Sequence, residues 1–206
     1  LRKKGNDTFK VLYGMEGYLI NDTDSEVGRL NAKGKDETYV VFDIETTGLS
    51  PASEEITEIG AVKIVGGEIG ETYSQLINPQ KPIPEKIVSL TGITDAMVAD
   101  KPTIDTVLPE FLAFCEGATV VAHNAAFDTG FIRQKAGNLG LIFSNPVMDT
   151  LRLSRELFPE AEKHSLGVVA ERMGVSLKNH HRAVDDATAT AEIFLKFQDL
   201  AAEQGG

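Results

Sequence analysis

The sequence predicts an α/β fold in which helices cover a mixed β-sheet. Two observations favour this class. Residues 38–78 contain strand-like stretches with no helix between them, which predicts an antiparallel meander. Residues 84–204 then alternate helical and strand-like stretches, and this alternation places helices on the faces of the sheet. With 206 residues, 42% of them hydrophobic, the chain is long enough for one sizeable domain with a real core.

The individual elements follow from periodicity and from Gly punctuation. The first strand is expected at 38–45, and the next two lie on either side of Gly66-Gly67, a two-residue hairpin signal within 55–78. The remaining elements are expected in this order: a short helix and turn at 84–94, an amphipathic helix at 103–117, a strand at 118–124, a helix from 125 to Gly137 or Gly140, a strand at 146–150, helices at 151–158 and 165–174, a loop at 175–182 and a final helix at 183–204.

Residues 1–37 differ from the rest of the chain. FKVLYGMEGYLI at 9–20 looks rich in strand, and polar stretches at 1–7 and 21–37 flank it. We expect the second polar stretch to be a linker or flexible loop, so that the compact domain begins at residue 38. Because the chain begins with Leu1 rather than Met, we expect it to be a fragment of a longer protein.

The composition excludes several classes of protein. One cysteine and four histidines exclude a disulfide framework and a Cys-rich zinc site. The net charge of −11 argues against a general nucleic-acid coat, but not against an enzyme that grips a few nucleotides through metal ions. No apolar run approaches the ~20 residues of a membrane span and no export leader opens the chain, so we expect a cytoplasmic protein without a membrane partner.

Two carboxylates lie at the end of the first expected strand, in the stretch VVFDIETTGL at 40–49. Because side chains alternate across a strand, Asp43 and Glu45 share one face and Ile44 takes the other. Adjacent carboxylates on an apolar strand repel each other and resist desolvation, so this pair predicts a partner that supplies positive charge.

A polar turn, Thr46-Thr47-Gly48-Leu49, follows these acids. We expect its backbone N–H groups to hold a terminal nucleotide, with Gly48 allowing close approach and Leu49 acting as a base-stacking wedge.

Two further acids lie where helices begin. Asp128 falls in the first turns of the helix that follows a buried strand. In the final helix, Asp186 lies on the apolar face, three residues after Ala183, whereas Asp185 falls on the polar face with Glu192. A carboxylate on a core-facing stripe needs a partner, so Asp186 is the candidate and Asp185 is expected to be a solvated helix-start charge.

The histidines can be separated in the same way. His181 precedes Asp186 by five residues, in the loop before the final helix, from which it can swing over a site. His180 is expected to point elsewhere. His164 is expected to cap or pack against the helix that follows it, and His123 to support the turn after its strand.

Together, Asp43, Glu45, Asp128 and Asp186 form an oxygen-only set of the kind that Mg²⁺ and Mn²⁺ prefer. Two such cations, ~3.5–4 Å apart, activate water and stabilise the leaving oxygen of a phosphodiester. His181 can serve as general base, because the pKa of an imidazole lies near the operating pH.

Three motifs in this sequence resemble those of a known family. FDIETTGL, HNAAFD and HRAVDDA are similar, in order, to the motifs of the DnaQ-like DEDDh 3′→5′ exonucleases, and EIGAV, LTGIT and HSLGVVAERMGV are similar to the connecting segments. The resemblance covers residues 38–200. It implies a ribonuclease-H-like fold with a five-stranded mixed sheet, two Mg²⁺ or Mn²⁺ ions, and release of nucleoside 5′-monophosphates from a 3′ end.

The resemblance also assigns residues. Carried over by position, Asp43, Glu45, Asp128 and Asp186 are the metal-site acids and His181 is the base. Asn124, within HNAAFD, joins the Thr46–Leu49 turn as a substrate-binding residue.

FKVLYGMEGYLINDT, at 9–23, resembles the polymerase-and-histidinol-phosphatase domain into which the exonuclease of PolC-type DNA polymerase III alpha subunits is inserted. This resemblance implies that 1–37 is a stub of the interrupted domain plus a linker, and that 38–206 is an exonuclease domain. It implies proofreading of a DNA 3′ end, single-stranded or frayed. The rest of the polymerase chain would be a partner, and a sliding clamp is a further candidate.

Two alternatives stay open. One is a stand-alone exonuclease that acts on RNA ends or on DNA-repair intermediates. The other is a noncatalytic module that binds a 3′ end or a protein partner. The residues do not decide between DNA and RNA, because recognition of the 2′-hydroxyl depends on the geometry of the pocket.

Overall fold

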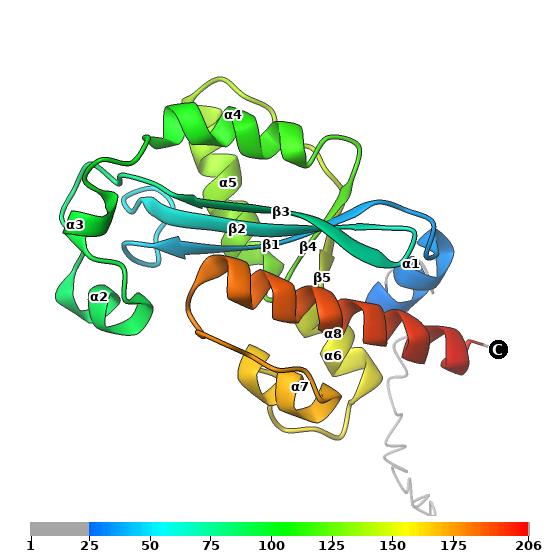
Figure 1. Cartoon of the computed structure of the whole chain (residues 1–206). Coiled ribbons are helices and arrows are strands. Elements are labelled where there is room, and N and C mark those ends of the chain that lie inside the picture. Colours follow the sequence, from blue (N-terminus) through cyan, green and yellow to red (C-terminus); the bar gives the residue numbers. More distant parts are fainter. Residues whose placement is uncertain (1–24, 206) are drawn as a thin grey trace, which may run out of the picture.

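The computed structural model describes residues 25–205 and contains one five-stranded mixed sheet (Figure 1). The strand order is β3-β2-β1-β4-β5, with β1 pairing antiparallel to β2 and parallel to β4. The strands are β1 (Tyr39–Thr46), β2 (Ile56–Val65), β3 (Glu68–Leu76), β4 (Thr119–Ala122) and β5 (Val147–Asp149). The predicted antiparallel meander and the mixed sheet are confirmed.

The β2–β3 hairpin turns at the predicted glycine pair. Gly66 and Gly67 both have positive φ, 58° and 79°. A two-residue turn that follows the right-handed twist of its strands requires positive φ at both positions, which glycine adopts without steric cost.

Helices cover both faces of the sheet (Figure 1). They are α1 (Glu26–Lys33), α2 (Glu85–Thr91), α3 (Asp95–Val98), α4 (Ile104–Phe114), α5 (Ala125–Asn138), α6 (Thr150–Leu157), α7 (Leu166–Met173) and α8 (Ala183–Gln204). None of the helices within residues 25–205 has the length and apolar character needed to cross a membrane.

The two faces of β1 serve two separate cores. Val40, Phe42 and Ile44 pack with residues of α4 and α5, whereas Tyr39 and Val41 pack with residues of α6, α7 and α8. This alternation fixes the direction of the next side chains along the strand: the positions after Val41 in the same row face α8.

Residues 26–33 form α1, so the expectation of a linker or flexible loop across 21–37 is wrong there. The Ser25 hydroxyl caps the helix by accepting the N–H of Gly28 at 2.7 Å, and Leu30 is buried against the α8 side of the core. Composition alone missed this helix, because one cap and two buried side chains, Glu26 and Leu30, suffice to dock a short polar segment. The strand-rich stretch predicted at 9–20 lies outside the described residues.

Candidate metal and active site

The first two acids of the site come from the row of β1 side chains that faces α8. Asp43 and Glu45 continue the row of Tyr39 and Val41 and are half-buried at the end of the strand. They lie where the apolar core under α8 gives way to a cavity of about 210 Å³, and both side chains line that cavity.

Asp186 approaches the same cavity from the first turn of α8. It is 4% exposed, whereas its neighbour Asp185 is half-exposed, so the helical phase predicted from sequence is confirmed. Asp43, Glu45 and Asp186 each offer a carboxylate oxygen within 4.8 Å of the others.

Asp128 completes the set from α5. It is 3% exposed and lines the cavity with the other three acids. Its Oδ1 accepts the backbone N–H of Ile44 at 3.2 Å, so α5 is fixed to the same stretch of β1 that carries Asp43. A larger cavity of about 680 Å³ lies beside Thr38 and Thr119, and none of the four acids lines it.

Burial, more than the neighbouring charges, raises the pKa values of three of the acids, Glu45, Asp128 and Asp43. Burial, and then the charges of Asp186, Glu58 and Asp128, raise the pKa of Glu45 to about 9. Burial raises the pKa of Asp128 to about 8 despite the N–H of Ile44, and burial with the neighbouring acids raises that of Asp43 well above its usual range.

No lysine or arginine within residues 25–205 forms an ion pair with any of these four acids. Four carboxylates that no lysine or arginine of residues 25–205 pairs with offer the oxygen ligands that a hard divalent cation requires, so the residues present fit such an ion.

Both histidines of the loop before α8 reach Asp186, which corrects the expectation that His180 points elsewhere. His180 Nδ1 lies 2.9 Å from Asp186 Oδ1, and the backbone N–H of His181 donates to Asp186 Oδ2 at 3.1 Å. The cause is a tight turn in which Asn179 and His181 have positive φ, 45° and 71°, so the chain folds back and stacks the two rings 3.8 Å apart. Both line the cavity.

The imidazole of His181 favours its neutral form. Burial, and then the neighbouring His180, lower its pKa below the usual value. A neutral ring at neutral pH is the form that can accept a proton.

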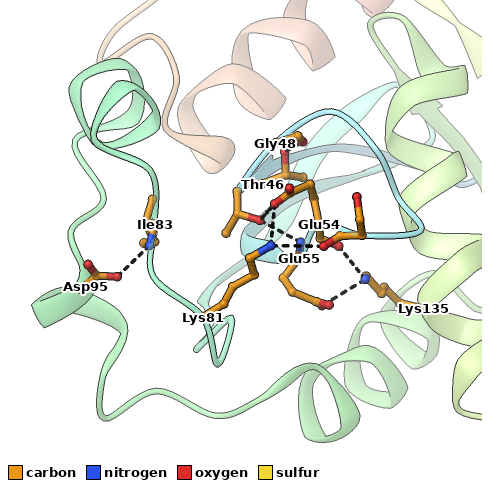
Figure 2. A network of polar contacts seen from close by, with 10 residues as sticks. Thr46, Gly48, Glu54, Glu55, Lys81, Ile83, Asp95 and Lys135 are labelled. Carbon is orange, nitrogen blue, oxygen red and sulfur yellow. Dashed lines mark hydrogen bonds and ion pairs between the residues drawn. The ribbon is translucent and has the colours of Figure 1, made fainter.

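Figure 2 shows the polar network beside the turn after Glu45, in which Glu54 and Lys81 lie close to Thr46 and Gly48. Thr47 is buried inside this turn. The Thr47 hydroxyl donates to Glu54 Oε2 at 2.5 Å and accepts the N–H of Glu55 at 2.9 Å. The Thr47 N–H is also engaged, by the Glu55 carbonyl. The donors of Thr47 are used inside the turn and it is 1% exposed, so a contact between Thr47 and a nucleotide stays a prediction.

The rest of the turn divides into anchored and free positions. The Thr46 hydroxyl donates to the Gly48 carbonyl at 2.5 Å and Thr46 is 8% exposed. Leu49 is 83% exposed, and the N–H groups of Gly48 and Leu49 have no partner in the described part of the chain. These two N–H groups and the Leu49 side chain are what the turn offers to a ligand.

Asn124 lies in the left-handed conformation, with φ of 64°, at the start of α5. Its backbone N–H donates to Asp149 Oδ1 at 3.0 Å, and its exposed side chain lines the cavity. His123 hydrogen-bonds Thr150 Oγ1 and the His164 carbonyl through its two ring nitrogens, as expected of a residue that supports this turn.

Beside the site lies an ion pair that was not predicted from the sequence. Glu58 of β2 is 1% exposed, lies opposite Glu45 in the β1–β2 register, and pairs with Arg182, the residue before α8. The available signal was an acid inside the apolar strand ITEIGAV; its partner, 124 residues away, had none.

Comparisons with known proteins agree on one kind of domain. The family model RNase_T, described as exonuclease, matches residues 40–194. The PolC-type DNA polymerase III of Clostridium perfringens is 52% identical over 195 residues, and that of Thermotoga maritima is 43% identical over 199 residues. Each match covers 95% of this chain but only 13% or 14% of the relative, so the chain spans about one seventh of these proteins.

Solved structures share the fold. Exonuclease X, in complex with 5′ overhanging duplex DNA, is 31% identical with a TM-score of 0.65, over 78% of this chain and 91% of its own. The nuclease domain of 3′hExo, a DEDDh family member bound to rAMP, is 19% identical with a TM-score of 0.66, over 78% and 90%. Exonuclease I is 19% identical with a TM-score of 0.70, over 79% and 42%. The last two likenesses concern the fold alone.

Proposed function

Since the chain belongs to the RNase_T family of exonucleases, we propose that it is a metal-dependent 3′→5′ exonuclease that releases nucleoside 5′-monophosphates from DNA 3′ ends. One observation carries the proposal: Asp43, Glu45, Asp128 and Asp186 line one cavity and no lysine or arginine within residues 25–205 pairs with them. Structural acids are normally paired, so a cluster like this is expected to hold cations.

DEDDh exonucleases use divalent metal ions, and the identity of the ions here is part of the proposal. We assign two Mg²⁺ or Mn²⁺ ions to the carboxylates of Asp43, Glu45, Asp128 and Asp186. When bound, such ions supply Lewis-acid polarisation of a phosphodiester and a lowered pKa for an attacking water.

The protein's own groups then have separate tasks. His181, neutral because burial lowers its pKa, accepts the proton of the attacking water. The free N–H groups of Gly48 and Leu49 and the exposed Leu49 side chain receive the terminal nucleotide. Asn124, at the start of α5, lines the cavity of the four acids. The hydrogen bond from Ile44 to Asp128 holds α5 against β1, so the acids keep their mutual positions.

We further propose that this activity proofreads for a replicative polymerase. The chain is homologous, over 95% of its length, to part of PolC-type DNA polymerase III. The polymerase partner and the DNA substrate rest on that homology, and Exonuclease X, at 31% identity, was solved with duplex DNA. The remainder of such a polymerase chain would be the partner. Residues 1–37 as a stub, a sliding-clamp contact and a cytoplasmic location stay predictions.

The test is to incubate the protein in Mg²⁺ with 3′-labelled single-stranded DNA, with duplexes whose primer ends are matched or mismatched, and with RNA, and to size the products. We expect mononucleotides, faster release from unpaired ends because pairing and stacking must first be broken, and no release in EDTA. Asp43→Asn is the inactive control.

Other outcomes point to the alternatives. Equal rates on matched and mismatched ends would contradict proofreading, and preferred cleavage of RNA would favour an RNA exonuclease. Binding of a 3′ end without cleavage would indicate a noncatalytic module.

A further inference from the structure

We infer that Glu58 and Arg182 are positioning residues of this site: their ion pair fixes the first turn of α8, so that Asp186 and the histidine loop stay opposite Asp43 and Glu45. The inference rests on the proposed function, because it concerns how the same cation site is held.

The contacts make Glu58 the cap of α8. Arg182 Nε and Nη2 both donate to Glu58 Oε2, at 3.0 and 2.9 Å, and the Ala183 N–H donates to Oε1 at 2.5 Å. Both carboxylate oxygens are therefore used. Arg182, the residue at the N-cap position, offers no side-chain acceptor to the helix. A carboxylate at a helix N-terminus satisfies a free N–H and interacts favourably with the helix dipole, and here β2 supplies it.

A second contact fixes the same turn independently. A Cβ at Gly60 would lie 2.1 Å from Val184 N and 2.3 Å from the Ala183 carbonyl carbon, so the start of α8 rests directly on the β2 backbone. Gly60 is the partner of Asp43 in the β1–β2 ladder. The helix start is thus pinned beside one acid of the site and, through Glu58, beside another.

Stability alone does not account for this pair. α8 is already held by a buried face that includes Phe194 and Phe197, and a buried ion pair is on average a weak stabiliser of a fold. The pair adds a defined position for the first turn of α8. Asp186 is three residues past Ala183, within the turn that is pinned, so a shift of that turn moves a ligand of the cation site.

The chain offers a matched control. Glu26 of α1 is 2% exposed and pairs with Arg29 and Arg152, each at 2.9 Å, but it does not line the cavity of the four acids. Glu26→Gln therefore weakens a buried Glu–Arg interaction of the same chemical type elsewhere in the fold.

The experiment compares wild type, Arg182→Ala, Arg182→Lys, Glu58→Gln and the control Glu26→Gln. Three quantities are measured: the dissociation constant of Mn²⁺ by electron paramagnetic resonance of the free ion, amide hydrogen exchange at 183–187, and Tm. We expect Arg182→Ala to weaken Mn²⁺ binding by about tenfold, the lower end of the loss caused by removing a hydrogen-bond partner of a metal ligand, because Arg182 acts on Asp186 only through the helix turn. The same substitution should accelerate exchange at 183–187. Arg182→Lys should recover part of the affinity, and Glu26→Gln should lower Tm with unchanged Mn²⁺ binding.

Unchanged Mn²⁺ affinity and unchanged exchange in Arg182→Ala would overturn the inference, even with a lowered Tm, because the pair would then be merely structural. If Glu58→Gln fails to fold, Arg182→Ala still decides, since the Arg182 side chain is 36% exposed. If wild type binds no Mn²⁺, the proposed cation site fails, and hydrogen exchange alone decides the inference: faster exchange at 183–187 supports it and equal exchange overturns it.

Discussion

The acids around β1 and β2 fall into two groups that differ in what faces them. Glu54 and Glu58 have partners from the chain itself, Lys81 and Thr47 for the first and Arg182 for the second. Asp43 and Glu45, a few residues away on the neighbouring strand, have other carboxylates as neighbours.

The pKa values record this difference. The hydrogen bond from Thr47 and the nearby Lys81 lower the pKa of Glu54, whereas burial and the neighbouring acids raise that of Glu45 to about 9. The first group is completed by the chain and serves as scaffold, and the second is completed only by a cation from solution. Substitutions in the two groups should therefore differ in effect, from loss of turnover in the second group to a small change in substrate binding in the first.

Asp186→Asn should cause the largest effect, loss of nearly all turnover, because it removes a charged oxygen from the cation site. Its matched control is Asp185→Asn, which removes the same charge one residue earlier on the half-exposed side of α8 and should leave most of the turnover. Single-turnover cleavage of a 3′-labelled strand measures both. Equal losses would mean that net charge, rather than the cluster, controls the reaction.

His181→Ala should lower turnover by about 10²–10⁴-fold, the usual contribution of a general base. His180→Ala should do much less, because its Nδ1 is engaged with Asp186 and no proton transfer is assigned to it. The turnover rates of the two variants are compared at saturating Mg²⁺. The opposite ranking would transfer the base to His180, whose contact with Asp186 was not foreseen.

Much of the fold and the choice of acids could be predicted from the sequence, because both depend on local periodicity. Alternation along β1 put Asp43 and Glu45 on one face, and the 3.6-residue period separated Asp186 from Asp185; the burial of these helix residues agrees. The exonuclease family that the motifs predicted is confirmed by the family match over 40–194.

What could not be predicted depends on contacts between distant residues or on backbone conformation. The Glu58–Arg182 pair joins residues 124 positions apart. His180 faces the cavity because Asn179 and His181 adopt positive φ, which no periodic pattern encodes. Thr47 looked like a surface residue of a polar turn, but Glu54, seven residues later, captures its hydroxyl.

The third prediction concerns pH in the absence of metal. Folding raises the pKa of Glu45 to about 9 and that of Asp128 to about 8, whereas both are about 4 in the unfolded chain. At any pH between the unfolded and the folded pKa, the folded state therefore binds more protons than the unfolded state. Stability contributed by these protonated acids is therefore present at low pH and lost as pH rises toward 8–9.

Mg²⁺ should reverse this trend, because it favours the ionised carboxylates and binds only the folded site. We expect its stabilising effect on Tm to be larger at a pH of about 8.5 than at about 6, and Asp128→Asn to reduce that difference. The stabilising effect is the difference between Tm in Mg²⁺ and Tm in EDTA, measured at each of the two pH values. An Mg²⁺ effect that is the same at both would contradict the raised pKa values.

The smallest effect is expected in the scaffold group. Glu54 accepts from Thr47 and Lys81, and a Cβ at Gly48 would lie 2.8 Å from Glu54 Cγ, so this side chain supports the turn that presents Gly48 and Leu49 (Figure 2).

Glu54→Gln keeps an acceptor for Thr47 and loses the charge facing Lys81. We expect KM for a short DNA to rise about two- to fivefold with kcat nearly unchanged, since the pair is only half-buried and acts only on ground-state binding. Asp199→Asn, which breaks the exposed pair with Lys35 at the far end of α8, is the control and should leave KM unchanged. A fall in kcat as large as that of His181→Ala would place Glu54 in the catalytic group and remove the distinction between the two sets of acids.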